Sequence, residues 1–565
     1  MNQIIKSIQF NNGYSLELQQ DSIVVFVGAN NVGKTQALKD IHQLLCKQTL
    51  APVIVPSIEI NKPPVEEMRQ LAESISDVQL EGGRRAYYGY GFQINERLFE
   101  QYDREEDFPN GLGGLITVFI DTQRRLNTIN SSGPLGPGTK KQNLMYSAVY
   151  DSAFRKQLDD SFYSAFGTHI VPDRISGGGG GIGAFLRTGE PVRLKEQEVT
   201  EESLDEFIRE LEIRPEAQNQ GDGIRGYLGI MLEFVAGYRK VVFIDEPESF
   251  LHPPQSRAIG RSIGEMLGAD QQAFIATHSK DVVLGLLESS EKRVILVRIE
   301  RKGKENSYFK LDGDGLKSIY DDSLLRYSNI LDGIFRSHVV LCESDSDCKM
   351  YSIVLDVLST SSGSHPDVLF VHSGGKHRMP IVLDALIKLG IPVDVVADMD
   401  ILDAPAVLEK MLTVCGQSWD EIKDIYSSFV KSLDVPNSVI TRTGLRDSIG
   451  NILDESADSA VSDDELKRIE ATLKKPSKWV SIKRFGEQSI SRGQQWARYT
   501  QIKDALSKAH IHLVPCGEIE NFVKDATGHG PHWVNNVLEM YPDLDDEVYD
   551  EIKGFVANWR LWETD

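Results

Sequence analysis

The chain has 565 residues, 41% of them hydrophobic, and carries a formal net charge of −23. This length implies two or more domains with sizeable cores, and the composition excludes a chain that is disordered overall. No stretch approaches the roughly 18 consecutive apolar residues of a membrane-spanning helix, and the five cysteines are scattered without metal-ligand spacing. We therefore expect a cytoplasmic protein with reduced thiols, no zinc site and no membrane contact.

The first lobe begins with alternating apolar residues on both sides of Asn11-Asn12-Gly13, which predicts an antiparallel hairpin. The apolar stretch 22–27 follows, then a glycine-rich loop, then an amphipathic segment, so we expect strand, phosphate loop and helix. Backbone N–H groups of such a loop surround phosphate oxygens, and the helix directs its positive end at them. Lys34 would neutralise the outer phosphates and Thr35 would bind magnesium, which predicts an ATP site. The other expected nucleotide-binding positions in the loop are Gly28, Asn30, Asn31 and Gly33.

Residues 50–220 lack a regular pattern, and we expect them to be inserted helical and loop material. Within them, the run Thr117 to Gln123 predicts a strand that brings Gln123 to the magnesium. The run Gly177 to Gly181 predicts a mobile loop.

Two further apolar strands end in polar residues. Val241 to Ile244 precedes Asp245 and Glu246, and the continuous apolar run is typical of a strand buried on both faces of a parallel sheet. Asp245 would hold the magnesium shell, and Glu246 would orient or deprotonate the attacking water. The strand 274–276 is followed by His278, which could contact the terminal phosphate.

Together, these motifs resemble the head of an ATP-binding-cassette (ABC-type) ATPase, and the RecF, SMC and OLD-type variants are the most similar. The resemblance implies an ATPase domain over residues 1–335 that dimerises around ATP. It also implies a signature loop shortly before Asp245 that contacts the partner subunit's nucleotide. Gly221 and Gly223 occupy that place, although the family usually has a serine there. The long coiled-coil arms of SMC proteins are absent, since no heptad run persists before Asp245.

The second lobe shows strand and helix alternating twice, which predicts a parallel sheet. The buried-type strand 338–342 ends at Glu343, and Asp347 follows one turn later. A second strand leads to Gly374-Gly375, and a third ends at Asp398-Met399-Asp400. On an extended segment both of these aspartates would point the same way, so two hard oxygen ligands would converge on magnesium or manganese.

Glu343, the Gly374-Gly375 turn and the Asp398/Asp400 pair resemble the Toprim fold. Its fusion behind a cassette ATPase resembles the OLD family of ATP-dependent endonucleases. The resemblance implies a Toprim nuclease domain over residues 336–565 with a helical insertion at about 405–505. It also implies a site for two metal ions that includes a late glutamate, for which we choose Glu520 with Glu518 as the alternative. A lysine that stabilises the transition state could be Lys376, Lys483 or Lys524. The metal ligands implied in this lobe are Glu343, Asp347, Asp398, Asp400 and Glu520.

The sequence thus predicts an α/β protein that hydrolyses ATP with Mg²⁺ or Mn²⁺ and cleaves DNA, gated by head dimerisation into dimers or tetramers. The resemblance implies antiviral defence, with an accessory protein or RNA as a further partner. One alternative is a Toprim nuclease that cuts RNA such as transfer RNA, and another is a RecF/SMC-like ATPase clamp without nuclease activity. Because the net charge is strongly negative, nucleic acid would need a local basic groove. Candidate basic pairs are Arg84-Arg85, Arg124-Arg125, Lys140-Lys141, Lys474-Lys475 and Lys483-Arg484.

Overall fold

The computed structural model divides into two compact units, Met1–Tyr327 and Ser328–Thr564. It describes residues 3–47, 51–102, 104–105, 108, 111–130, 140–173, 185–192, 200–235, 239–290, 293–311, 329–363, 365–433, 445–446, 449–450, 452–453, 461–462, 465–466, 469, 479–559 and 561. Within these ranges no helix is both long enough and apolar enough to cross a bilayer. The glycine run 177–181 and Lys474-Lys475 lie outside the described residues.

A six-stranded sheet forms the centre of the first unit. Its strands, in spatial order, are β14 (Glu305–Leu311), β13 (Val294–Lys302), β3 (Ile23–Val27), β12 (Gln272–Ala276), β11 (Val241–Asp245) and β8 (Thr117–Ile120). Neighbouring strands from β13 to β8 pair in parallel, and β14 pairs antiparallel with β13. Every residue of β3 and β12 is buried, because helices cover a parallel sheet on both faces.

Three smaller antiparallel sheets surround the central one. The predicted hairpin is confirmed, since β1 pairs with β2. β8 lies within the stretch 50–220 that we expected to be inserted material, yet it is an edge strand of the central sheet. The strands of the smaller sheets are β1 (Ile5–Gln9), β2 (Ser15–Glu17) and β4 (Ser57–Ile60), then β5 (Ser76–Glu81), β6 (Arg84–Gly89) and β7 (Phe92–Asn95), then β9 (Ile170–Asp173) and β10 (Phe185–Thr188).

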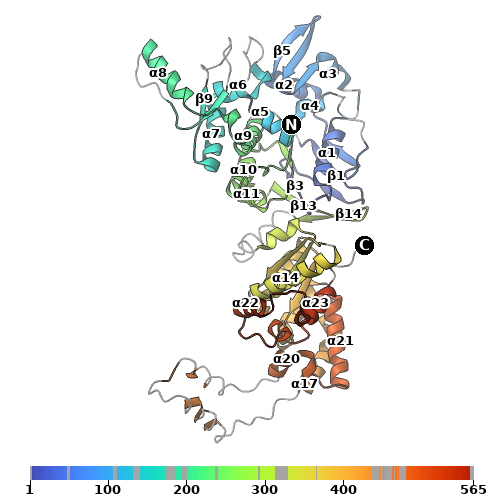
Figure 1. Ribbon diagram of the computed structural model, residues 1–565. Helices are drawn as coiled ribbons and strands as arrows, with labels where there is room; N and C mark the ends of the chain where they lie inside the picture. The colour runs from blue at the N-terminus through green and yellow to red at the C-terminus, as the bar shows by residue number, and fades with distance from the viewer. Residues whose placement is uncertain are drawn as a thin grey trace. The chain divides into compact units, whose positions relative to one another are not determined.

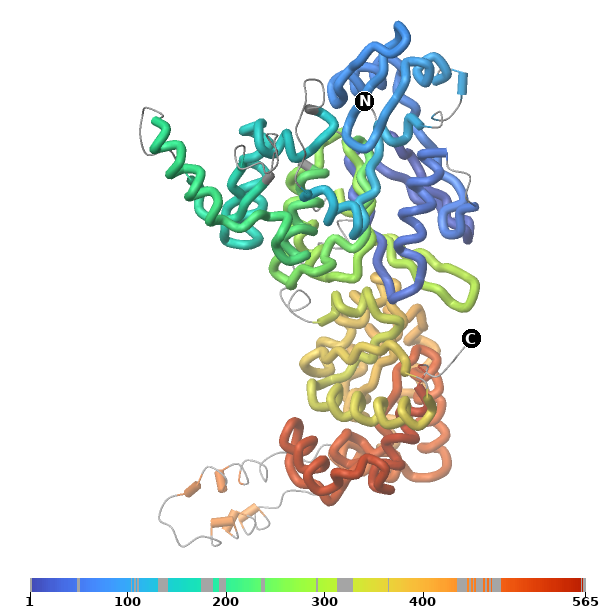
Figure 2. The backbone as a smooth tube through the Cα atoms, turned by 45° about the horizontal axis from the view of Figure 1, so that its top comes forward, coloured from blue at the N-terminus to red at the C-terminus, as the bar shows by residue number. Residues whose placement is uncertain are grey.

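Helices complete the first unit. They are α1 (Lys34–Leu45), α2 (Val65–Ile75), α3 (Glu96–Tyr102), α4 (Gly113–Ile116), α5 (Thr122–Thr128), α6 (Leu144–Tyr150), α7 (Ser152–Phe166), α8 (Glu201–Glu212), α9 (Asp222–Val235), α10 (Pro253–Met266) and α11 (Lys280–Ser290), with 3₁₀ turns η1 (Lys140–Gln142) and η2 (Ala217–Asn219). α10 and α11 lie side by side next to the central sheet (Figure 1). In Figures 1 and 2, α8 extends away from that sheet.

The second unit contains a four-stranded sheet in which all neighbours are parallel. Its spatial order is β16 (Val368–His372), β15 (His338–Cys342), β17 (Val393–Ala397) and β18 (Ile511–Leu513). The chain first moves from β15 to β16 on one side, then returns past β15 to β17. The order therefore reverses between β15 and β17, and ligands of such sheets bind at the carboxyl ends of the strands at this point.

Helices of the second unit lie before, between and after these strands. The unit begins with the turn η4 (Asn329–Phe335), where an added Cβ at Gly333 would lie 3.0 Å from the Val339 side chain, so η4 packs against β15. The helices are α14 (Asp345–Ser362), α15 (Met379–Lys388), α16 (Pro405–Val414), α17 (Lys423–Ser432), α20 (Trp479–Phe485), α21 (Gln494–Lys508), α22 (Pro531–Met540) and α23 (Asp550–Ala557). The remaining 3₁₀ turns are η5 (Lys376–Arg378), η6 (Met399–Asp403), η7 (Trp419–Glu421), η8 (Gly486–Ser489), η9 (Ile519–Phe522) and η10 (Glu547–Tyr549).

A buried carboxylate joins three strands of this sheet. Asp394 of β17 is fully buried, and its two carboxylate oxygens each lie 2.8 Å from a histidine Nε2, that of His338 on β15 and that of His512 on β18. Burial alone would raise the pKa of Asp394, but the hydrogen bonds and charges of the two histidines outweigh it and hold the pKa well below its usual value. The cluster therefore stabilises the sheet from within.

We predict that Asp394→Asn lowers the free energy of unfolding of the second unit by about 3 kcal/mol at pH 7, since it removes the charged acceptor of two buried hydrogen bonds. A carboxyl group with a lowered folded pKa stabilises the fold above its unfolded pKa of about 4, and this contribution is lost as the pH falls toward the folded value. The difference between wild type and variant should therefore shrink below pH ~4. Calorimetric unfolding across pH measures this.

The matched control is Asp367→Asn, because the Asp367 side chain is 38% exposed and pairs with Arg336 at the surface. Such pairs contribute at most about 1 kcal/mol. An equal loss of unfolding free energy in both variants would show that the buried cluster stabilises the fold no more than a surface pair does.

Candidate functional site

The loop between β3 and α1 has the backbone that phosphate binding requires. Gly28 and Gly33 have φ angles of 139° and 105°, and Asn31, with a φ of 65°, is also left-handed. A Cβ at Gly28 would lie 2.3 Å from the Ile299 carbonyl oxygen, so only glycine fits there. Gly33 is the N-cap of α1, and the helix therefore points its positive end into the loop.

Lys34 and Thr35 open this helix. The Lys34 ammonium group donates hydrogen bonds to the carbonyl oxygens of Gly28 (2.9 Å) and Ala29 (2.8 Å), so it bends back over the loop. Burial lowers the pKa of Lys34, and the nearby carboxylates of Glu246, Glu248 and Asp245 oppose the shift. A phosphate would offer this partly desolvated ammonium group a charged partner in place of two carbonyls.

Thr35 donates a hydrogen bond from Oγ1 to Asp245 Oδ1 at 2.8 Å, across 210 residues of sequence. Asp245 ends β11, where burial raises the pKa of its carboxyl group and the Thr35 hydrogen bond opposes that shift. The predicted pair of magnesium-binding residues therefore lies at one strand edge. A hydroxyl and a carboxylate at this position fit the oxygen ligands that magnesium prefers.

Glu246 and His278 also lie at this edge. Glu246 has a φ of 47°, a left-handed conformation that costs a non-glycine residue roughly 1–2 kcal/mol. His278 Nδ1 lies 3.7 Å from Glu246 Oε1 and 3.3 Å from Glu248 Oε1. The predicted base and phosphate-contacting residue are thus neighbours.

Glu248 was missed by the sequence analysis. Its Oε1 accepts a hydrogen bond from the His278 backbone N–H at 2.9 Å, and the side chain is only 8% exposed. Burial raises its pKa, with hydrogen bonds from the backbone opposing the shift. Glu248 therefore joins the segment after β11 to the segment after β12. Its position three residues after Asp245 could have indicated a role at the site, but the sequence around it is equally typical of an exposed surface carboxylate.

Arg124 and Arg125 do not form the surface basic patch that we considered for nucleic acid. Arg125 is fully buried and donates from one guanidinium nitrogen to the carbonyl oxygens of Glu246 (2.8 Å) and Asp245 (3.3 Å). Arg124 pairs with Glu233 of α9, with 2.8 Å between Nε and Oε1. The prediction fails for this pair because both guanidinium groups satisfy internal acceptors.

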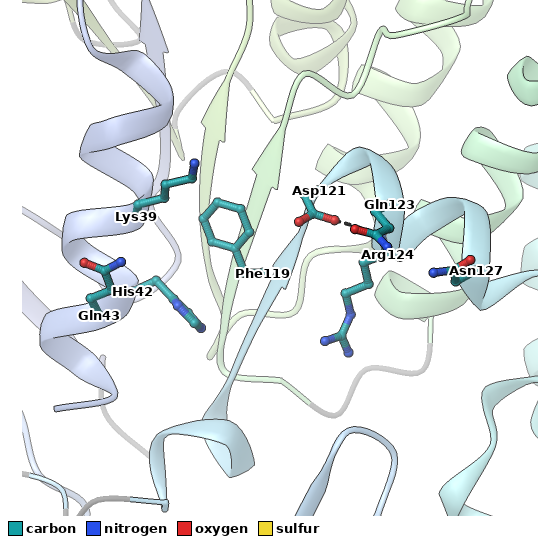
Figure 3. A pocket seen from close by; sticks show the side chains of 8 residues that line it. All are labelled: Lys39, His42, Gln43, Phe119, Asp121, Gln123, Arg124 and Asn127. Atoms are coloured by element: carbon teal, nitrogen blue, oxygen red, sulfur yellow. Dashed lines mark hydrogen bonds between the residues drawn. The ribbon is translucent and has the colours of Figure 1, made fainter. Parts of the chain in front are cut away.

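Gln123 lies on α5 and not on a strand, because β8 ends at Ile120 and Asp121 caps the helix. Gln123 lines a cavity of about 500 Å³ between α1 and α5 (Figure 3). Lys39 lines the same cavity, and its charge acts on Asp245, so the cavity borders the magnesium edge. The other lining residues are His42, Gln43, Phe119, Asp121, Arg124 and Asn127.

Gly221 and Gly223 flank the start of α9, which is the apolar helix expected after the signature loop. A Cβ at Gly223 would lie 2.6 Å from the Phe250 carbonyl oxygen, whereas Gly221 has open space around it. Close packing inside the unit is therefore a sufficient reason for glycine at position 223.

In the second unit, carboxylates gather at the carboxyl ends of β15 and β17, where the strand order reverses. Glu343 follows β15, and its Oε1 accepts a hydrogen bond from the Lys376 backbone N–H at 2.8 Å. The Gly374 and Gly375 N–H groups both bind the Glu343 carbonyl oxygen, so this turn wraps around it. Asp347 lies in the first turn of α14, where one carboxylate oxygen accepts from the Ser344 N–H at 2.8 Å.

Asp398 and Asp400 do not lie on an extended segment, which corrects that part of the prediction. β17 ends at Ala397, Asp398 is the N-cap of η6, and Asp400 lies within this 3₁₀ turn. Burial raises the pKa of Asp398 well above its usual value, and so do the charges of Glu343, Asp347, Asp400 and Glu520. The five predicted metal ligands therefore share one electrostatic environment, although a turn and not a strand brings the two aspartates together.

Glu520 has a partner that the sequence gave no means of finding. Its Oε1 lies 2.5 Å from His529 Nδ1 and accepts a hydrogen bond from the Gly530 N–H at 3.0 Å. One ligand atom each from Glu518, Glu520 and His529 lie within 4.8 Å of one another. Glu518 and Glu520 are thus both at the cluster, and His529 adds an imidazole from a separate loop.

Two of the three candidate lysines reach this cluster. Lys376 Nζ lies 3.2 Å from Asp400 Oδ1, and Lys483 Nζ lies 3.6 Å from Asp400 Oδ2 and 3.3 Å from Glu518 Oε2. Lys483 belongs to α20, which lies within the expected helical insertion at about 405–505. No ion pair joins Lys524 to these acids among the described residues.

Residues 23–285 match the family described as "AAA domain, putative AbiEii toxin, Type IV TA system". The first unit contains a P-loop ATPase domain. No curated protein matches the sequence. The ATPase domain occupies the unit that holds Lys34, Thr35 and Asp245, and the match ends before the second unit begins.

Several solved structures also match the chain. One is an Smc head bound to the C-terminal winged-helix domain of ScpA, at 12% identity and a TM-score of 0.34, covering 56% of this chain and 100% of that chain. The SMC head domain from Thermotoga maritima has 13% identity, a TM-score of 0.30 and coverages of 55% and 97%. CbiO1 from Clostridium perfringens, part of the ABC transporter complex CbiONQ, has 14% identity and a TM-score of 0.27, and the match covers 56% of this chain and 92% of that chain. Scores this low do not establish a shared fold.

We predict that Lys34→Ala weakens ATP binding at least tenfold and stops turnover, because charge-assisted hydrogen bonds contribute about 1.5–3 kcal/mol each. Binding of a fluorescent ATP analogue and phosphate release measure the two effects. Lys6→Ala is the control, since Lys6 is a surface lysine paired with Glu59 at 2.9 Å. Normal binding by the Lys34 variant would refute this site.

Proposed function

We propose that the ATPase domain hydrolyses ATP with Glu246 as the residue that orients or deprotonates the attacking water. Lys34 would bind the outer phosphates, and Thr35 and Asp245 would hold the magnesium ion. His278 would contact the terminal phosphate, supported by its position beside Glu246 and Glu248. Gln123 would approach the same edge from α5. In an ABC-type arrangement, Gly221 and Gly223 at the start of α9 would face the nucleotide of a second copy.

We further propose that the second unit is a Toprim nuclease domain of OLD type. The observation that supports this proposal is that burial and four carboxylates, those of Glu343, Asp347, Asp400 and Glu520, raise the pKa of Asp398, and that all five acids follow strands of one parallel sheet. Glu343 follows β15, Asp347 lies in α14, Asp398 and Asp400 lie at the N-cap and within η6, and Glu520 lies in η9. Acids that raise one another's pKa are costly to keep together, and such clusters are common at functional sites.

Divalent cations fit this cluster. Among the described residues no donor forms a hydrogen bond to the Asp398 carboxylate, although its surroundings are largely desolvated. Hard carboxylate oxygens are the ligands of magnesium and manganese, and a bound cation would remove the repulsion. Two cations at this site would activate a water and stabilise the leaving oxygen of a phosphodiester.

The chain's own residues would orient the substrate. Lys376 and Lys483 both lie beside Asp400, where an ammonium group could contact a phosphodiester and stabilise the charge that develops on it. Glu518 holds Lys483 from the other side. We assign DNA as the substrate and leave RNA as an outcome of the test below.

The proposal also covers how cleavage is controlled and the biological role of the protein. Dimerisation of ATPase domains around ATP would control cleavage, in a homodimer or tetramer. A role in antiviral defence is supported by the matched family's description, which names a toxin of a toxin–antitoxin system. An accessory protein or RNA would be the further partner.

We predict that Glu246→Gln lowers the rate of ATP hydrolysis at least about 100-fold, because a positioned general base contributes 10²–10⁴-fold. ATP binding should survive, so the variant should accumulate as an ATP-bound dimer. Single-turnover hydrolysis and light scattering with and without ATP measure this. Unchanged turnover would remove Glu246 from the site.

We also predict that the double variant Asp398→Asn/Asp400→Asn loses cleavage of plasmid DNA in magnesium or manganese and keeps ATP hydrolysis, because only the second site loses its cation ligands. Asp345→Asn is a matched control on the same unit. Asp345 lies in the first turn of α14 but is exposed and pairs with Lys349 at 2.7 Å. Gel assays on plasmid DNA and, in parallel, on total transfer RNA measure the substrate class.

The outcomes separate the candidate functions. Cleavage of RNA alone, lost in the double variant, would replace DNA by RNA as the substrate. Cleavage that persists in the double variant would move the active site elsewhere. Cleavage of neither nucleic acid by the wild type, with or without ATP, would contradict the nuclease proposal and favour an ATPase clamp.

A further inference from the structure

A buried arginine supports the strained residue at the ATPase edge. Glu246 adopts its left-handed conformation with three groups bound to its backbone: its N–H donates to the Ala276 carbonyl at 2.8 Å, and its carbonyl accepts from the Ser249 N–H and from Arg125. Of these three contacts, only the one from Arg125, at 2.8 Å, is made by a side chain. Because the conformation is costly by itself, these contacts must maintain it.

The Arg125 side chain is positioned by contacts within α5 and with α9. A second guanidinium nitrogen donates to Thr122 Oγ1 at 3.0 Å. The helices approach so closely that a Cβ at Gly229 would lie 1.9 Å from the Arg125 carbonyl oxygen, and one at Gly226 would lie 3.7 Å from Arg125 Nε. Position 229 therefore requires glycine, and Arg125 packs against the face of α9 that carries Gly226 and Gly229.

The same helix pair is joined by polar contacts on either side. Arg124 binds Glu233 near the end of α9, and Arg225 near its start donates to the Leu126 carbonyl at 3.2 Å. α5 and α9 are therefore joined near both ends of α9, and the Arg125 side chain extends from α5 to the backbone at the end of β11. A shift of α9 would be transmitted to Glu246 through one guanidinium group.

We propose that Arg125 is a positioning residue for ATP hydrolysis, which holds Glu246 in its left-handed conformation and makes that conformation depend on the position of α9. In the reaction, a water oxygen bonds to the terminal phosphorus, the bridging P–O bond breaks toward ADP, and Glu246 orients the water or accepts its proton. Arg125 is fully buried, and in this proposal it acts through the backbone carbonyl of Glu246. This inference depends on the role proposed above for Glu246.

The test compares Arg125→Gln and Arg125→Lys with a matched control. Arg239 is also a buried arginine, and it donates to the backbone carbonyls of Tyr90 and Leu115 near the other end of β11. Arg239→Gln therefore removes a similar set of bonds away from Glu246. We expect Arg125→Gln to lower kcat at least about tenfold with KM and the affinity for an ATP analogue nearly unchanged, since a displaced catalytic group affects the transition state alone.

Arg125→Lys should restore part of kcat, because an ammonium group can still donate to the Glu246 carbonyl. Arg239→Gln should lower the thermal midpoint without changing kcat per folded molecule. If Arg125→Gln does not fold, the lysine variant still carries the comparison. The inference is wrong if kcat is unchanged in the Arg125 variants, or if kcat falls only in proportion to the folded fraction, as for a purely structural residue.

A double variant identifies the route. If Arg125 acts through Glu246, then Arg125→Gln should cost nothing further when added to Glu246→Gln, because the residue that it positions has already lost its function. Equal losses in both backgrounds would show that Arg125 acts by another route. If Glu246→Gln alone leaves hydrolysis intact, the role of Glu246 fails, and this outcome is distinct from a failure of Arg125.

Discussion

Parallel strand pairing is the constraint on which both sites depend. In the ATPase domain, Asp245 is paired with Ala276 and Ala276 with Phe26, so the loop after β3, the acids after β11 and the histidine after β12 all emerge at one edge. The hydrogen bond between Thr35 and Asp245 closes this edge. In the second sheet, Leu341 is paired with Val395, so Glu343, two residues after Leu341, and Asp398, three residues after Val395, emerge at one edge. Parallel sheets place strand ends together regardless of separation in the sequence.

The two edges differ in how charge is balanced. In the ATPase domain, the two cations Lys34 and Arg125 lie near the three acids Asp245, Glu246 and Glu248. In the second unit the acids outnumber the two lysines that reach them. The first edge differs from the second in its glycine-rich loop and in the positive end of α1, which suit the phosphates of a nucleotide. The second edge offers mainly carboxylates, which suit divalent cations.

Sequence patterns predicted the strands and the acids at their ends, because uninterrupted apolar runs such as 241–244 leave few other structures open. They failed where a local turn replaced a strand, as at Asp400 in η6 and Gln123 on α5, since a run of four residues does not fix where pairing stops. The roles of Arg125 and Glu248 were not identified, because they come from tertiary contacts with Glu246 and His278, which are 121 and 30 residues away. His529 was not identified because its contact with Glu520 depends on the path of the loop between them. The sequence does not distinguish two adjacent basic residues at the surface from two that bind internal acceptors, as Arg124 and Arg125 do.

The most direct test of a metal centre in the second unit is to measure Mn²⁺ binding to the full chain without nucleotide, by calorimetry and by electron paramagnetic resonance. We expect saturable binding that persists in Lys34→Ala and is lost in Asp398→Asn/Asp400→Asn, because a cation held by the carboxylates of the second unit would not require ATP. Binding that depends on Lys34, or that survives the double substitution, would contradict the claim that the carboxylates at the end of β15 and β17 form a metal centre.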